Sequence, residues 1–322
     1  MRETDYAFAV AKIRENENRL LKKNTMESLI TAADADEAMK ILADARFADF
    51  SSDSENTVFS KKASQAFELV SSVAPDVHLF DFIVVKNDFH NIKAILKSTV
   101  LDIDYNRYII TPYIIEPHLI KSAIDNKDYS VIPEFARYAV KDGYELLTTS
   151  MDGQLLDVFL DRLSLEVSIE MAKKSGEEFS VLLSETIAAV SDFNLAYRAG
   201  RTGKDISFIN NALAKNKFFD NDRLAKCAVS GKKELIEFIS ETGFKDLAKA
   251  LKTSDIAFER ESDDILIDFV SRAKYQCFSI APLIAFYLAS VSEIKTVRII
   301  LSCKRSNMDP DKIRERVRKL YV

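Results

Sequence analysis

The feature that most constrains this chain is a stretch, found in three places, in which an acid is followed by a base among apolar residues. The acids are Asp88 in VKNDFHNIKAILKS, Asp192 in VSDFNLAYRAGR and Glu293 in VSEIKTVRIILSCKR. The bases that follow, after five, six and five positions, are Lys93, Arg198 and Arg298. Ile, Leu and Val surround each pair at helical spacing. The acids stand 104 and 101 positions apart, which predicts three copies of one helical unit.

Each predicted copy holds three segments in the same order. A capped amphipathic helix comes first, a long amphipathic run second, and the acid-to-base stretch third, after an apolar run. We therefore predict units at 1–110, 111–212 and 213–322, the last ending in a basic helix. The stretch DIDYNRYIITPYIIEP, which begins at Asp102 and is rich in Tyr and Ile, is interpreted as a short strand or an extended connector between the first two units.

The fold class follows from how few chain breakers the sequence contains. Its 322 residues include only 7 Gly and 6 Pro, whereas 47% are apolar and 30% are charged. A β-sandwich or barrel needs many tight turns, which this composition does not supply. We predict an all-α protein.

Charge gives no general argument for a nucleic-acid partner, because the formal net charge is −5. It is unevenly distributed, since residues 295–322 carry nine basic side chains against three acidic ones. Asp309 and Pro310 are suited to begin a terminal helix, with Ile313, Val317 and Leu320 as its apolar stripe. Its basic face is either a solvated surface or a docking surface for an anionic partner.

Signals for secretion and for membrane insertion are weak. The first ten residues, MRETDYAFAV, contain acids where a secretory signal needs a basic start. The longest apolar run, IAPLIAFYLASV, is shorter than the ~20 residues of a membrane span and contains Pro282. Three scattered cysteines, Cys227, Cys277 and Cys303, suit a reducing compartment. We expect a cytoplasmic chain that does not cross a membrane by itself.

Motifs for catalysis and metal binding fail on spacing. TGKD at Thr202 and SGKK at Ser230 have Arg198 and Lys226 where a phosphate-binding loop needs its first glycine, so both are interpreted as turns. The three histidines, His78, His90 and His118, have no other His or Cys within one helical turn. Neighbouring acids such as Asp263 and Asp264 cannot face each other across a cleft. We predict no catalytic, cofactor-binding or metal-binding residues.

The acid-to-base stretches themselves have two interpretations. If Asp88, Asp192 and Glu293 lie at or near helix starts, they stabilise helix N-termini and the later bases pair across units. Alternatively, the three stretches line a common surface, because equivalent segments of repeated units tend to face the same way.

The whole chain resembles one family, the C subunit of the archaeal and bacterial vacuolar-type ATPases, which is similar to the d subunit of the eukaryotic enzyme. The resemblance lies in YAFAVAKIRENENRLL near the start, in DFHNIKAILK, and most specifically in PLIAFYLASVSEIKTVRIIL and the closing IRERVRKLYV. The residues that match family motifs or the repeat are Tyr6, Asp88, Asn91, Asp192, Glu293 and Tyr321.

The resemblance implies three similar helical domains in a pseudo-threefold, funnel-like arrangement. It also implies a non-catalytic rotor subunit on the cytoplasmic face of the membrane, which joins the central-stalk subunits to the membrane rotor ring and transmits torque. The candidate contact residues are Lys93, Arg198, Arg298, Arg314 and Arg318. Two other classes stay open: a helical-repeat adaptor for other protein partners, and an all-helical enzyme whose site is assembled from distant residues.

Overall fold

A computed structural model describes residues 3–322, and its fold is all-α, as predicted: none of these residues forms a β-strand. The chain divides into two compact units, one of residues 3–77 with 243–322 and one of residues 78–242. The three repeat units and their funnel-like arrangement stay predictions.

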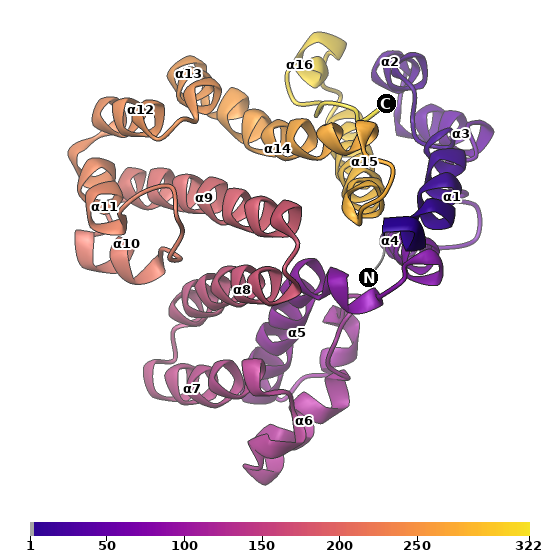
Figure 1. Cartoon of the computed structure of the whole chain (residues 1–322). Coiled ribbons are helices and arrows are strands. Elements are labelled where there is room, and N and C mark those ends of the chain that lie inside the picture. The colour runs from indigo at the N-terminus through magenta and orange to yellow at the C-terminus, as the bar shows by residue number, and fades with distance from the viewer. Residues whose placement is uncertain (1–2) are drawn as a thin grey trace. The chain divides into compact units, whose positions relative to one another are not determined.

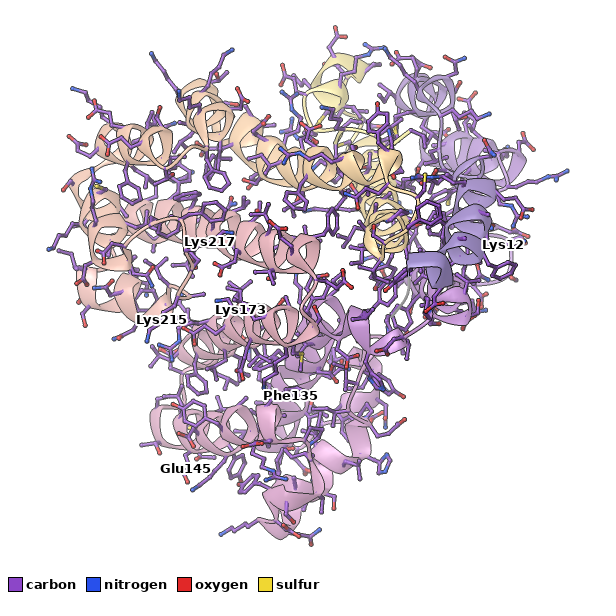
Figure 2. All side chains as sticks on the ribbon, in the orientation of Figure 1. Lys12, Phe135, Glu145, Lys173, Lys215 and Lys217 are labelled. Carbon is purple, nitrogen blue, oxygen red and sulfur yellow. The ribbon has the colours of Figure 1, made fainter. Side chains whose placement is uncertain are left out.

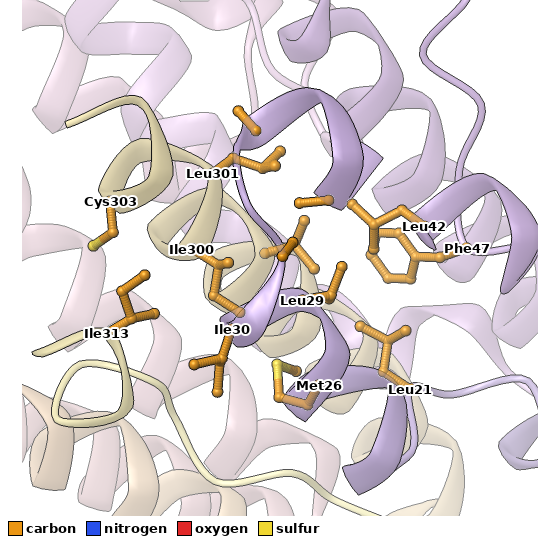
Figure 3. Close-up of a cluster of buried hydrophobic side chains, with 14 of the residues drawn as sticks. Leu21, Met26, Leu29, Ile30, Leu42, Phe47, Ile300, Leu301, Cys303 and Ile313 are labelled. Carbon is orange, nitrogen blue, oxygen red and sulfur yellow. The ribbon is translucent and has the colours of Figure 1, made fainter. Parts of the chain in front are cut away.

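The first compact unit joins the two ends of the chain around one long helix. Its helices are η1 (Glu3–Tyr6), α1 (Ala7–Glu17), α2 (Lys23–Thr31), α3 (Ala35–Asp44), α4 (Glu55–Val73), α13 (Lys245–Thr253), α14 (Asp255–Ser271), η5 (Arg272–Tyr275), α15 (Ala281–Arg305) and α16 (Pro310–Arg314). The long helix α15 packs against α1, α3, α4 and α14 (Figure 1). Figure 3 shows the core that results, where Leu29 and Leu42 meet Ile300 and Leu301. This core fixes the N-terminal helices on the C-terminal one.

The second compact unit is built on three long helices, α5, α8 and α9. Its helices are α5 (Asp81–Leu101), η3 (Tyr105–Tyr108), α6 (Pro117–Asn126), η4 (Tyr129–Val131), α7 (Glu134–Ser150), α8 (Gly153–Ser175), α9 (Glu178–Arg201), α10 (Ile206–Ala212), α11 (Asn221–Ser230) and α12 (Lys232–Glu241), and η2 (Val77–Phe80) precedes α5. Helix α5 packs against α6, α7 and α8, while α9 packs against α8, α10 and α11. Ile92, Ile95 and Leu96 of α5 are fully buried in the core with Leu156 and Leu160 of α8.

Local sequence sets where many of these helices begin. An Asp or Ser directly before the helix accepts a hydrogen bond from a first-turn N–H and so satisfies one of its free donors. Residues that cap in this way include Asp34, Ser54, Asp152, Asp205, Asp220 and Ser254. Pro117 stands in the first turn of α6, where a residue without an N–H leaves no helix hydrogen bond unmade.

Gly200 marks a close approach of α9 to α11. A Cβ at this position would collide with the carbonyl oxygen of Ala228, so the two backbones leave no room for a side chain. Among residues 3–322, α9 is also the helix with the length and apolar composition of a membrane span. Of its most apolar stretch, 61% is buried inside the folded chain, as in the central helix of a bundle.

The stretch from Asp102 is a connector and not a strand. Apart from the single turn η3 it has no regular structure, and side chains of α5 hydrogen-bond its backbone. The C-terminal segment also differs from the prediction. Helix α16 begins at Pro310 but ends at Arg314, so Val317 and Leu320 lie on irregular backbone, although both still pack against the first unit's core.

Candidate functional site

The three repeated acids lie in the middle of long helices and not at helix starts, so the prediction of helix-start acids is wrong. Asp88 is in α5, Asp192 in α9 and Glu293 in α15, and each lies well beyond the first turn of its helix. The apolar run before each acid is itself helical and places the helix start further upstream. All three carboxyl groups are buried, and each accepts hydrogen bonds from a loop backbone.

Asp88 holds the connector that leads into α6. Its Oδ1 accepts from the backbone N–H groups of Ile114, at 3.0 Å, and of Ile115, at 2.8 Å. One turn along α5, Asn91 exchanges two hydrogen bonds with the backbone of Ile110, at 2.9 and 3.0 Å. Burial raises the pKa of Asp88 to about 7, although the two amide donors act in the opposite direction. Asp88 and Asn91 therefore make the backbone hydrogen bonds that a neighbouring strand would otherwise make with this connector.

Asp192 plays the same part before α11. It accepts from the backbone N–H of Ala214 and from the side-chain amide of Asn216, each at 3.1 Å. Burial raises its pKa to about 8 against these two hydrogen bonds. Both donors lie in the loop between α10 and α11, so α9 fixes the path of the chain into α11.

Glu293 makes the third such contact, between opposite ends of the sequence. Its Oε1 accepts from the backbone N–H of Leu21, at 2.7 Å, directly before α2 begins at Lys23. Burial raises the pKa of Glu293 to about 7, and the charge of Lys62 opposes that shift. Each acid therefore holds a loop that leads into another helix: α6 for Asp88, α11 for Asp192 and α2 for Glu293. We call Asp88, Asp192 and Glu293 the anchor carboxyls.

The predicted basic residues fall in two different environments in the second unit. Lys93 is 2.9 Å from Asp161 and 3.6 Å from Asp157, and it joins α5 to α8. Arg198 is exposed, and the contact recorded for its guanidinium is with the carbonyl oxygen of Asn194 on the same helix, at 3.3 Å. Of these two residues, Arg198 is the one available to a partner.

The other three basic residues lie in the first unit. Arg298 is exposed, and its guanidinium stands over the ring of Phe59, 4.8 Å from the ring centre. Arg318 has only 8% of its side chain exposed and binds Asp263 at 2.7 Å. Arg314 pairs with Glu27 of α2 and with Asp311. The basic C-terminal segment is therefore largely bound to acids of its own chain.

The family-motif residues at the two termini contact the same helix. Tyr6 is buried beside α1, and Tyr321 is buried with its hydroxyl 3.2 Å from Glu17 of α1. Burial and the nearby Glu17 raise the pKa of Tyr321 to about 12. Arg14 of α1 donates to the carbonyl oxygens of Ala273 and Lys274, at 2.9 and 2.7 Å. These contacts fasten the last residues and the segment after α14 onto α1.

Sequence reasoning missed two buried charged residues. Glu185 lies two turns before Asp192 on α9. Its carboxylate accepts a hydrogen bond from the backbone N–H of Lys217 at 2.8 Å and pairs with Lys173 at 3.1 Å. Both lysines are labelled in Figure 2. Lys304, near the end of α15, donates to the carbonyl oxygens of Ile30, at 2.6 Å, and Ala32 at the end of α2. Neither belongs to a repeated pattern, and only their apolar surroundings could have indicated burial.

The chemistry of these groups is that of attachment. The three anchor carboxyls accept hydrogen bonds from backbone donors. Among residues 3–322, no three His, Cys, Asp or Glu side chains gather as metal ligands. The two Gly-Lys stretches form turns, with Gly203 at φ 70° after α9 and Gly231 at φ 134° before α12. Fold and site define a class of helical scaffold in which long helices are fixed to loops by buried acids.

Comparison with known proteins identifies the particular scaffold. The family model described as ATP synthase (C/AC39) subunit matches residues 9–316, and the chain belongs to this family, which confirms the resemblance noted in the sequence. It is 23% identical to the C subunit of the V-type sodium ATPase of Enterococcus hirae over 319 residues, 96% of this chain and 97% of that protein. It is 28% identical to the C subunit of the A-type ATP synthase of Haloferax volcanii over 125 residues, 37% of this chain and 36% of that protein.

Proposed function

We propose that this chain is a non-catalytic rotor subunit of a vacuolar-type ATPase or ATP synthase. It joins the central-stalk subunits to the membrane rotor ring, on the cytoplasmic face of the membrane, and transmits torque between ATP hydrolysis or synthesis and ion translocation. The observation that supports this proposal is the extent of the match. The similarity to the C subunit of a V-type sodium ATPase runs through 96% of this chain and 97% of that protein, so the two chains are alike from end to end.

The fold supports a mechanical role, because a part that transmits torque must resist deformation. Close-packed helices with few glycines are stiff, and this chain has only 7 glycines in 322 residues. The anchor carboxyls add fixed points where a long helix holds a loop between other helices, at Ile115, Ala214 and Leu21. The loops at these points are thereby tied to the helices on which they lie.

The exposed cations are the proposed contacts with the other rotor parts. Arg198 and Arg298 are exposed, and within residues 3–322 the structure pairs neither with a carboxylate. Lys93, Arg314 and Arg318 already bind acids of this chain, so a partner would share them. Such exposed charges give salt-sensitive contacts, since ions screen them within about 10 Å at 0.1 M salt.

Co-elution tests this proposal. We expect the purified chain to elute with the detergent-solubilised rotor ring and with the isolated central-stalk subunits, less strongly at moderate than at low salt. Arg298→Glu should weaken one of these complexes. Lys226→Glu, an equal charge change at an exposed position of α11, serves as the control. If the folded wild-type chain binds neither component, the proposal is wrong and a helical adaptor for other proteins becomes the better account.

A further inference from the structure

The first unit contains a cavity whose lining includes Arg298 and Arg318, two of the residues proposed above as partner contacts. It has a volume of about 450 Å³ and lies between the first turns of α14, the second half of α15 and the irregular tail at 315–322. Figure 1 shows α14, α15 and the end of the chain side by side. The volume falls in the range of small-molecule sites, roughly 300–1,000 Å³.

The charges that line this cavity are strongly unequal. Lys295 and Arg298 come from α15, and Arg316 and Arg318 come from the tail, whereas Glu259 is the acid in the lining. This excess of positive charge lines an open hollow at the surface and gives it a positive potential. An anion is therefore the ligand that the lining favours.

Two of the four cations are already held by an acid, and two are not. Asp263 binds Lys295 and Arg318, each at 2.7 Å, which fixes these side chains at one side of the cavity. Arg298 instead stacks on Phe59, and Arg316 donates to the carbonyl oxygen of Lys312 at 3.2 Å. Within residues 3–322 neither Arg298 nor Arg316 is paired with a carboxylate. Their guanidinium groups retain donors for a ligand.

We propose that this cavity binds a small phosphorylated molecule. The N–H groups of a guanidinium match two phosphate oxygens, and stacking on Phe59 orients Arg298 before a ligand arrives. Two free arginines beside two held cations suit a group with two or more negative charges, such as a phosphate or pyrophosphate ester, better than a single carboxylate. Ile256 and Ile299 supply an apolar wall for the organic part of the ligand. Because Arg316 belongs to the tail and Arg298 to α15, a bound ligand also links the two segments.

Calorimetric titration of the isolated full chain with sodium pyrophosphate tests this proposal independently of any rotor partner. At constant ionic strength we expect saturable binding of one ligand per chain. Arg298→Ala and Arg316→Ala should each weaken it by about tenfold or more, the effect of losing one charged hydrogen bond. Arg305→Ala is the matched control, because Arg305 lies on the same helix but pairs with Glu55 and does not line the cavity.

Three results would overturn the proposal. The first is a wild-type chain that is helical by circular dichroism but does not bind pyrophosphate. The second is an equal loss of affinity in Arg298→Ala and Arg305→Ala, which would show general screening in place of a site. The third is binding of citrate as tight as that of pyrophosphate, which would show that carboxylates and not phosphates are recognised. The co-elution described above does not depend on any of these results.

Discussion

Replacement of Asp88 by alanine should destabilise the chain far more than loss of an ordinary surface acid. Its Oδ1 accepts from two backbone N–H groups, those of Ile114 and Ile115, and the Asp88 residue is fully buried. Alanine removes the acceptor and leaves without a partner two donors, one in the half-buried Ile114 and one in the buried Ile115.

The expected magnitude follows from the number of donors. An unsatisfied buried N–H costs about 1–3 kcal/mol, so two donors predict a loss of about 2–6 kcal/mol in the free energy of unfolding. Asparagine keeps a carbonyl oxygen where Oδ1 lies, and Asp88→Asn should retain most of that free energy. Asp161→Ala is the control, because the Asp161 side chain is 65% exposed and pairs with Lys93 at the surface, which predicts a loss of about 1 kcal/mol or less.

Urea unfolding followed by far-ultraviolet circular dichroism provides the measurement, since the chain is helical and contains no Trp for fluorescence. The order of stability should be wild type, then Asp161→Ala and Asp88→Asn, and then Asp88→Ala. If Asp88→Ala loses no more than Asp161→Ala, the buried carboxyl does not hold the connector and the reasoning fails.

Further predictions concern pH, close packing and a buried lysine. The pKa of Asp88 is about 7 in the folded chain against an ordinary 3.8, so between these values the folded state keeps a proton that the unfolded state releases. As the pH rises from about 4 to 7, this group should therefore lower the free energy of unfolding by about 1.4 kcal/mol per pH unit. The difference in that free energy between wild type and Asp88→Asn, measured across the same range, isolates the contribution of Asp88. If that difference does not change with pH, Asp88 is already ionised in the folded state over this range. Gly200→Ala should lower the melting temperature by several degrees because its Cβ meets the carbonyl oxygen of Ala228, whereas Gly153→Ala, which meets only the flexible end of Lys97, should not. Equal melting temperatures would contradict the close approach of α9 and α11. Lys304→Met should lower the free energy of unfolding in urea by about 1–3 kcal/mol, because the buried carbonyl oxygens of Ile30 and Ala32 lose their donor. Lys312→Met, at an exposed position, should leave that free energy unchanged. Equal free energies of unfolding in the two variants would mean that the Lys304 ammonium is not needed there.

The fold class could be predicted because it depends on local features. Few glycines and prolines, together with apolar stripes at helical spacing, are enough to exclude a β-rich chain. The recurrence of Asp88, Asp192 and Glu293 also identified three acids that turn out to share one structural setting. That recurrence is visible in sequence because similar packing demands similar residues at similar intervals.

What the acids bind could not be predicted, because the donors are backbone groups and leave no mark in the sequence. Glu293 accepts from Leu21 across 272 positions, and nothing at Leu21 distinguishes its N–H from any other. The helix-start interpretation failed for a related reason. An Asp within an apolar run is compatible with a helix that begins there or with one that began earlier, and tertiary burial decides between them.

The C-terminal segment shows the limit of periodicity as evidence. Ile313, Val317 and Leu320 have helical spacing and all contact the core, yet the helix stops at Arg314. Beyond that point Arg318 binds Asp263, and Lys319 binds Asp264 through its backbone and Asp268 through its side chain. These ties to α14 fix the tail on an irregular path that a helix would not follow.

The most direct test of the account is a coupling measurement on the rotary ATPase reconstituted in vesicles with and without this chain. We predict that the assembly lacking the chain hydrolyses ATP without moving ions, and that adding the wild-type chain restores ion movement driven by ATP. Ion transport at full rate in the absence of the chain would contradict its role as the link between stalk and ring.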